Sequence, residues 1–262
     1  MITIEVHDEF RAQFGEDRLL WSLFRQRPHG YFIEIGAYDG VQLSNTCFLE
    51  SKGWSGLLVE PIPQLAQLAA NARPRSEVFA TACGAPTSPP VSTFTIANNV
   101  PVLSFLKADQ DHIDRCLREG AQLVEIQVPV RTVDSLLIET RRQLINRASR
   151  SPSEGGNPQH GIWQAGKGWS IDVVTIDTEG SELDVLEGFN LERFRPRILI
   201  MENDRDAGAT IQPYLDQRGY RRFHRQVIND FYIRKDDAAE DLDLEGMAQL
   251  ARTLNPSSAN PG

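Results

Sequence analysis

The chain has 262 residues, of which 40% are hydrophobic and 24% charged, and its formal net charge is −9. These values are typical of a globular protein with one sizeable core, and the negative charge disfavours nucleic-acid binding, which depends on cationic contacts to phosphate. No stretch of about 18 consecutive apolar residues occurs, and the acidic first ten residues do not resemble a secretory signal. We therefore expect a cytoplasmic protein that binds neither nucleic acid nor a membrane.

Short apolar and β-branched runs alternate with helical patterns along most of the chain. The alternation predicts a mostly parallel sheet with helices on both faces, an α/β fold, behind an N-terminal helical segment at about residues 5–28. The helices are expected at 62–73 and 181–189, with Ser181 as a potential cap. The strands are expected at 31–37, 56–60, 77–83, 171–177 and 197–202.

The C-terminal part of this pattern differs. Residues 219–235, GYRRFHRQVINDFYIRK, predict two strands around a short turn, which leaves no room for a crossover helix. The sheet should therefore end in an antiparallel hairpin. Residues 236–245 carry six carboxylates and predict a solvated helix at the start of an acidic tail, 236–262.

An insertion separates the third and fourth predicted strands. Within it, residues 92–98 and 124–137 predict two further strands, the second leading into a helix, and residues 146–169 are rich in Ser, Pro and Gly, typical of a loop. We interpret residues 1–262 as a single domain with a loop insertion at about 141–169. The three cysteines, Cys47, Cys83 and Cys116, are odd in number and far apart, which fits neither a disulfide framework nor a zinc site.

The most informative stretch is YFIEIGAYDG, residues 31–40, where Glu34 lies inside an apolar run. A carboxylate buried alone is costly, so Glu34 should be hydrogen-bonded, and open α/β sheets bind ligands where the first strand ends. Gly36 would let the backbone approach a ligand, and Asp39 adds a second carboxylate. Tyr38 replaces the second glycine of the dinucleotide fingerprint. The pattern favours S-adenosylmethionine over a pyrophosphate; the alternative is a satisfied acid at a tight turn.

An acid also ends the second predicted strand. Glu60, at the end of GLLVE, is placed to accept hydrogen bonds from both hydroxyls of a ribose. Together with Glu34, it indicates an adenosine ligand. The third strand ends in ACGA, where Cys83 and Gly84 either border the adenine ring or form a plain turn.

Two constellations could act on a substrate. Asp177 ends the fourth strand, and Glu202 and Asn203 follow the fifth, so these oxygens could converge on a divalent cation such as Mg²⁺ that lowers the pKa of an acceptor hydroxyl. The alternative is that Asp177 hydrogen-bonds the substrate while the other two cap loops. His224 and Asp230 could form a general-base pair in the hairpin, or His224 could be an ordinary surface histidine.

Taken together, the motifs resemble those of the FkbM family of S-adenosylmethionine-dependent methyltransferases. The resemblance rests on QFGED (13–17), FIEIGAYDGVQLSNT (32–46), GWSGLLVEPIP (53–63), VRTVDSLL (130–137) and VVTIDTEGSELDVLEGF (173–189). It implies a class I methyltransferase fold, which is Rossmann-like with a mostly parallel seven-stranded sheet, and O-methylation of a sugar, glycan or other small natural product. It also implies that Glu34, Gly36, Asn45 and Glu60 contact the methyl donor, with Asp177 beside the transferred methyl.

The loop insertion departs from the family pattern. It carries four arginines and two tryptophans, Arg141, Arg142, Arg147, Arg150, Trp163 and Trp169. It either covers the acceptor with aromatic rings or is a surface excursion. The sequence thus predicts an O-methyltransferase with a small-molecule or carbohydrate acceptor. A nicotinamide-dependent oxidoreductase and a non-catalytic S-adenosylmethionine-binding module are the alternatives, and a homo-oligomer stays open.

Overall fold

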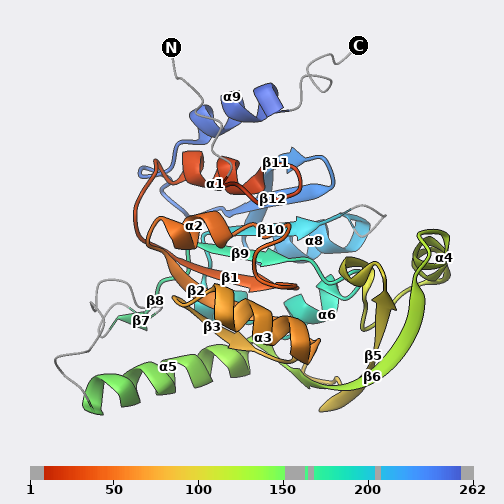
Figure 1. The fold of residues 1–262 in the computed structure, drawn as a ribbon. Helices are drawn as coiled ribbons and strands as arrows, with labels where there is room; N and C mark the ends of the chain where they lie inside the picture. The colour runs from red at the N-terminus through yellow and green to blue at the C-terminus, as the bar shows by residue number, and fades with distance from the viewer. Residues whose placement is uncertain (1–8, 151–162, 165–167, 204–207, 255–262) are drawn as a thin grey trace, which may run out of the picture.

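A computed structural model describes residues 9–150, 163–164, 168–203 and 208–254. Its centre is a seven-stranded sheet with the strand order β11-β12-β10-β9-β1-β2-β3 (Figure 1). Six strands run in the same direction, and β12 is antiparallel to both of its neighbours, β10 and β11. This confirms the predicted Rossmann-like α/β fold with a C-terminal hairpin. The strands are β1 Tyr31–Ile35, β2 Ser55–Val59, β3 Ser76–Phe79, β9 Val173–Ile176, β10 Ile198–Glu202, β11 Tyr220–Gln226 and β12 Asn229–Arg234.

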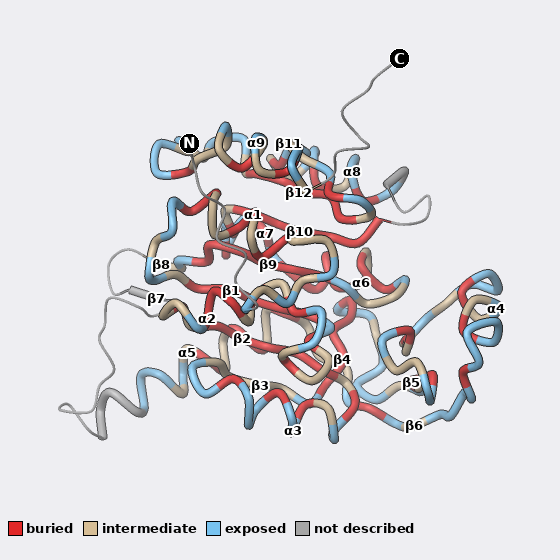
Figure 2. Tube along the Cα trace, turned by 45° about the horizontal axis from the view of Figure 1, so that its top comes forward, coloured by how far each residue is buried: buried red, intermediate tan, exposed pale blue. Residues whose placement is uncertain are grey.

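Helices cover both faces of this sheet, which explains why the central strands are buried along their whole length (Figure 2). The α1 face is covered by α1 Glu16–Leu23, α2 Cys47–Ser51, α3 Pro63–Ala72 and α9 Leu244–Leu254. The α5 face is covered by α5 Val133–Arg150, α6 Glu182–Glu187, α7 Leu191–Phe194 and α8 Gly208–Gln217. Within the described residues, no helix is both long and apolar enough to cross a lipid bilayer.

The predicted third strand divides into two pieces. β3 ends at Phe79 in the main sheet, where the N–H of Thr81 donates a hydrogen bond to the Phe79 carbonyl. β4 Ala82–Cys83 then joins a second sheet. That sheet contains β5 Val91–Asn98 and β6 Gln122–Arg131, which are connected through η1 Pro101–Leu103 and α4 Gln110–Arg118. We call residues 91–131 the arm, because they extend beside the main sheet in Figure 1.

The loop insertion is shorter than expected, since residues 141–150 continue helix α5. Strands β7 Trp163–Gln164 and β8 Gly168–Trp169 then pair with each other. The Trp169 ring packs against Phe194, with ring centroids 4.7 Å apart, just before β9 begins. Trp169 therefore lies at the edge of the sheet opposite the carboxyl ends of the strands, and the idea that it covers the acceptor is wrong. Whether the remainder of the loop covers the acceptor depends on residues 151–162 and on the side chains of Arg147, Arg150 and Trp163, which lie outside the described part.

The helix expected at residues 236–245 does not form: these residues are mostly exposed or half-buried, as expected, but the helix of the tail, α9, begins only at Leu244. Helix α9 packs against α1, and its Met247 and Ala251 are buried in the core of the α1 face. Asp237 and Asp241, which precede it, both bind the guanidinium of Arg197. The apolar positions at helical spacing therefore place the helix after the carboxylates, at residues 244–254. Residues 255–262, the expected frayed end, lie outside the described residues.

The QFGED motif joins the N-terminal segment to the hairpin. Asn229 Nδ2 donates to the buried Glu16 carboxylate at 2.7 Å, and Gln226 Nε2 donates to the Phe14 carbonyl at 2.7 Å. Just before the motif, Ala12 forms a β-bridge with Leu43, in the loop that follows β1. The motif therefore supports this loop from outside the sheet.

Candidate functional site

A cavity opens where β1, β2, β4 and β9 end, and residues of the arm form part of its wall. The space that no atom fills, counting the part open to solvent, is about 920 Å³. Six of the residues expected to bind the donor line it: Glu34, Gly36, Asn45, Glu60, Cys83 and Asp177.

Strand alternation explains why carboxylates gather at this edge. Phe32 and Leu58 lie in the core of the α1 face, and the side chains two positions later, Glu34 and Glu60, follow the same side. Ile200 lies in the same core, two positions before Glu202. Because parallel strands end at the same edge, acids at the ends of several strands are brought together.

Glu34 is buried, and groups of the protein satisfy its carboxylate. It accepts hydrogen bonds from the hydroxyls of Ser44 and Thr46 and from the Asn45 N–H, at 2.6–3.0 Å. The Arg73 guanidinium lies 3.5 Å away. A hydrogen-bonded Glu34 was expected, but its burial does not require a cationic ligand, since Arg73 and the two hydroxyls offset it.

The two glycines after Glu34 allow close contacts within the protein. A Cβ on Gly36 would lie 1.8 Å from the carbonyl oxygen of Asp177, and Gly36 has φ +87°. A Cβ on Gly40, with φ +79°, would lie 2.9 Å from Ala69 and 3.0 Å from Arg73. Both glycines thus allow close approach of other parts of the protein, and only Gly36 also borders the cavity.

Glu60 is buried at the end of β2. Its two oxygens accept the N–H groups of Tyr38 and Ile62, both at 2.9 Å. Burial raises the pKa of Glu60 to about 7, and the two backbone hydrogen bonds only partly oppose this. A buried carboxyl group that titrates near neutrality at the wall of a cavity is well placed to respond to a ligand.

Two residues expected at the donor site do not line the cavity. Asp39 accepts the N–H groups of Val41 and Gln42, each at 2.8 Å, and so caps the turn after β1. Gly84 lies under Ser88 and Val130, and its N–H donates to the Arg131 carbonyl. Cys83 does line the cavity, but burial raises the pKa of its thiol to about 12, so it stays protonated and is a poor nucleophile.

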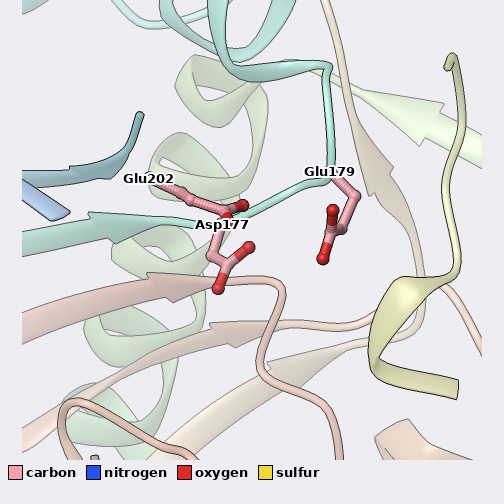
Figure 3. A group of neighbouring side chains, drawn as sticks. All are labelled: Asp177, Glu179 and Glu202. Carbon is pink, nitrogen blue, oxygen red and sulfur yellow. The ribbon is translucent and has the colours of Figure 1, made fainter. Parts of the chain in front are cut away.

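Three carboxylates meet beside the cavity, and they differ from the predicted set. Oxygens of Asp177, Glu179 and Glu202 lie within 4.8 Å of one another, and Figure 3 shows Asp177 between the other two. The Asn203 side chain instead donates to Asp230 at 2.6 Å, on the other face of the sheet. The prediction of Asn203 as a ligand in this group is wrong, because consecutive residues at a strand end point to opposite faces.

Glu179 connects this group to the arm. Its φ is +54°, and its carboxylate lies 3.3 Å from His112 Nδ1 and 3.9 Å from Arg115, both on α4. The buried Glu182 carboxylate accepts the N–H groups of Thr178 and Gly180, which shapes the turn that carries Glu179. The sequence shows Glu179 two residues after Asp177, but it gave no indication that Glu179 contacts α4 of the arm.

The expected His224–Asp230 pair does not form. His224 lies opposite Phe231 in the hairpin and Asp230 lies opposite Arg225, so the two side chains point to opposite faces. His224 Nε2 contacts Gln226 at 3.3 Å, and burial lowers the pKa of its imidazole. Asp230 is fully buried and pairs with Arg222 and Arg225. Neither residue lines the cavity.

Sequence reasoning missed most of the cavity wall on the arm. Phe94, Val102, Ser104 and Leu106 line the cavity, but the sequence around them carries no motif. Leu43 also lines it, with φ +59° and 46% of its surface exposed. An exposed leucine in the left-handed region, within the motif that follows β1, is a signal that only the backbone conformation reveals.

Comparison with known families finds one similarity. Residues 161–222, from before β7 into β11, match the family model described as the Methyltransferase FkbM domain. This match supports an FkbM-family methyltransferase. The matched segment contains Asp177, Glu179 and Glu202, and the strand order of the sheet agrees with the fold that the family resemblance implied. None of the curated proteins matches the chain.

The FkbM match supports methyltransferase activity, and methyltransferases of this family use S-adenosylmethionine as the methyl donor. The family match ends before β12 and does not reach the segments around Glu34 and Glu60. Those residues are connected to the matched part by the structure, since β1 pairs directly with β9 and the Asp177 N–H donates to the Ile35 carbonyl.

Proposed function

We propose that this FkbM methyltransferase transfers a methyl group from S-adenosylmethionine to a hydroxyl of a sugar, glycan or other small natural product. The observation that carries the donor assignment is the charge of the cavity. Four acids line it, Glu34, Glu60, Asp177 and Glu179, and none of its described lining residues is Lys, Arg or His. Arg73, behind the wall, offsets Glu34 alone among these four acids through a contact of 3.5 Å, so the argument rests on the other three. Acidic walls favour a donor with a sulfonium and an ammonium group.

The same charge argues against the oxidoreductase alternative. A nicotinamide dinucleotide carries a pyrophosphate, which proteins bind with backbone N–H groups at a glycine-rich turn or with cationic side chains. Here the N–H groups of Gly36 and Ala37 both donate to the Val59 carbonyl, and the Tyr38 N–H donates to Glu60. The turn after β1 therefore has few donors left for phosphate oxygens.

The cavity residues fit the donor at three places. Glu60 would accept the ribose hydroxyls, Asn45 would bind the amino-acid end, and the buried wall at Cys83 would border the adenine. When bound, S-adenosylmethionine supplies a methyl group that is activated by the positive charge on sulfur. The protein's task is then to align an oxygen nucleophile with this methyl group and to remove its proton.

The carboxylates at the end of β9 suit that task. Asp177 would accept a hydrogen bond from the acceptor hydroxyl and take its proton, and Glu179 and Glu202 lie next to it. These three acids would also hold a divalent cation such as Mg²⁺, which prefers oxygen ligands and would lower the pKa of the hydroxyl. Such a grouping of hard oxygen ligands favours an oxygen acceptor over a nitrogen or carbon acceptor.

The test is incubation with methyl-labelled S-adenosylmethionine and a panel of monosaccharides, oligosaccharides and macrolides, with and without Mg²⁺. We expect label in a hydroxyl of at least one acceptor, and Asp177→Asn should abolish its incorporation. Donor binding without transfer to any acceptor would favour the binding module. Hydride transfer from a reduced nicotinamide cofactor would refute the proposal.

A further inference from the structure

Arg73 is a buried arginine that joins three segments behind the cavity. It caps the C-terminal end of α3, and only 1% of its surface is exposed. Its Nε donates to Glu50 at 2.7 Å and its Nη1 donates to the Gly40 carbonyl at 2.7 Å. Its guanidinium also lies over the Phe32 ring of β1, 5.3 Å from the centroid. Arg73 does not line the cavity.

The same guanidinium fixes the direction of two hydroxyl groups. Nη1 donates to Ser44 Oγ at 3.2 Å, and Nη2 donates to Thr46 Oγ1 at 2.9 Å. Arginine can only donate, so both hydroxyl oxygens accept from Arg73 and their own protons point to Glu34. Arg73, the two hydroxyls and Glu34 therefore form one chain of hydrogen bonds with a single polarity.

This chain shapes the segment that forms one wall of the cavity. Gln42, Leu43, Ser44 and Asn45 all line it, and the Asn45 N–H is bound to Glu34. Arg73 holds the start of the segment at Gly40 and its end at Thr46. Gly40 has no side chain where the Arg73 stem passes, which permits this contact. Nothing else in the described network joins both ends of the segment to the core through one side chain.

We infer that Arg73 is a positioning residue for donor binding: it holds residues 40–46 so that Asn45 and the cavity wall are in place for the methyl donor. It acts through Ser44, Thr46 and Glu34 and does not touch the donor. This inference rests on the proposed function, because it assumes that the cavity binds S-adenosylmethionine.

The experiment is calorimetric titration of the full chain with S-adenosylhomocysteine, the demethylated donor, alongside thermal melting. Arg73→Met should weaken binding at least tenfold at a temperature where the variant is folded. Arg73→Lys should restore part of the affinity, since its ammonium group keeps the charge but cannot donate to all the partners of the planar Arg73 guanidinium. The matched control is Arg197→Met, which removes a half-buried arginine that binds Asp237 and Asp241 just before β10, at the opposite edge of the sheet. It should lower the melting temperature but change the affinity less than twofold.

The outcomes separate the two proposals. If the wild-type chain does not bind S-adenosylhomocysteine, the proposed function fails. If the wild type binds and Arg73→Met binds within twofold of it, or if Arg197→Met weakens binding equally, the positioning role is refuted. Should Arg73→Met not fold, Thr46→Val decides, because it removes one hydroxyl of the chain and keeps Arg73: binding at least threefold weaker supports the inference, and a smaller change overturns it.

Discussion

The raised pKa of Glu60 predicts that donor affinity depends on pH. The free carboxyl group has a pKa of about 7, against a usual value of 4.5, because it is buried with only two backbone N–H partners. Ribose hydroxyls donate hydrogen bonds best to the ionised carboxylate. Binding should therefore require deprotonation of Glu60, and affinity should fall as the pH is lowered below 7.

The size of the effect follows from this pKa. At pH 7.5 about three quarters of Glu60 is ionised, and at pH 5.5 about 3% is, so the affinity for S-adenosylhomocysteine should fall roughly 25-fold between these pH values. Calorimetry in two buffers of different ionisation enthalpy should also show release of nearly one proton per bound ligand at pH 6. Glu60→Gln should remove the pH dependence and bind at least about tenfold more weakly at pH 7.5, since a hydrogen bond to a charged group contributes about 1.5–3 kcal/mol.

The same pKa shift has a consequence for stability. A carboxyl group whose pKa is raised in the folded state favours folding below pH 4.5, and this contribution is lost as the pH rises through about 7. Chemical denaturation between pH 4.5 and 7 should show that the free energy of unfolding falls less steeply with pH in Glu60→Gln than in the wild type. A wild-type affinity that is constant between pH 5.5 and 7.5 would refute the reasoning about Glu60 and the ribose.

Three further predictions concern the metal, the histidine and the tail. EDTA should abolish methyl transfer and Mg²⁺ should restore it if the Asp177 group holds a cation, whereas full activity in the chelator removes the metal from the mechanism. His224→Asn should keep activity within about threefold, because the ring faces Phe231 and Gln226 outside the cavity; a hundredfold loss would restore its catalytic role. Met247→Ala should lower the free energy of unfolding by about 2–5 kcal/mol in urea denaturation, as expected for a buried side chain, and an unchanged value would contradict the packing of α9 on α1.

Where sequence prediction succeeded, the physical reason is local. Apolar runs of five or so residues bounded by turn residues have few alternatives to a buried parallel strand, so β1, β2, β9 and β10 were placed within about two residues. Acids at the ends of such strands must share one edge, which brought Glu34, Glu60 and Asp177 to a single cavity. The family resemblance rested on the same motifs.

Where it failed, the deciding contacts come from residues far apart in the sequence. Asn203 and Glu202 are neighbours in the chain, but the strand sends one to Asp230 and the other toward Asp177. His224 and Asp230 are close in sequence, but the strand register of the hairpin places their side chains on opposite faces of the sheet. A β-bulge between Arg222 and His224 shifts that register, and no local pattern predicts such a shift.

The sequence by itself determined the fold class and the edge of the sheet at which the cavity lies, because periodicity, turn residues and terminal acids act over a few residues. The tertiary structure decided how the buried charges are satisfied. The Glu34 carboxylate pairs with Arg73 and accepts hydrogen bonds from Ser44 and Thr46. The Glu179 carboxylate contacts His112 on α4 of the arm. Those pairings span long stretches of chain, and only the packed core fixes which side chains meet.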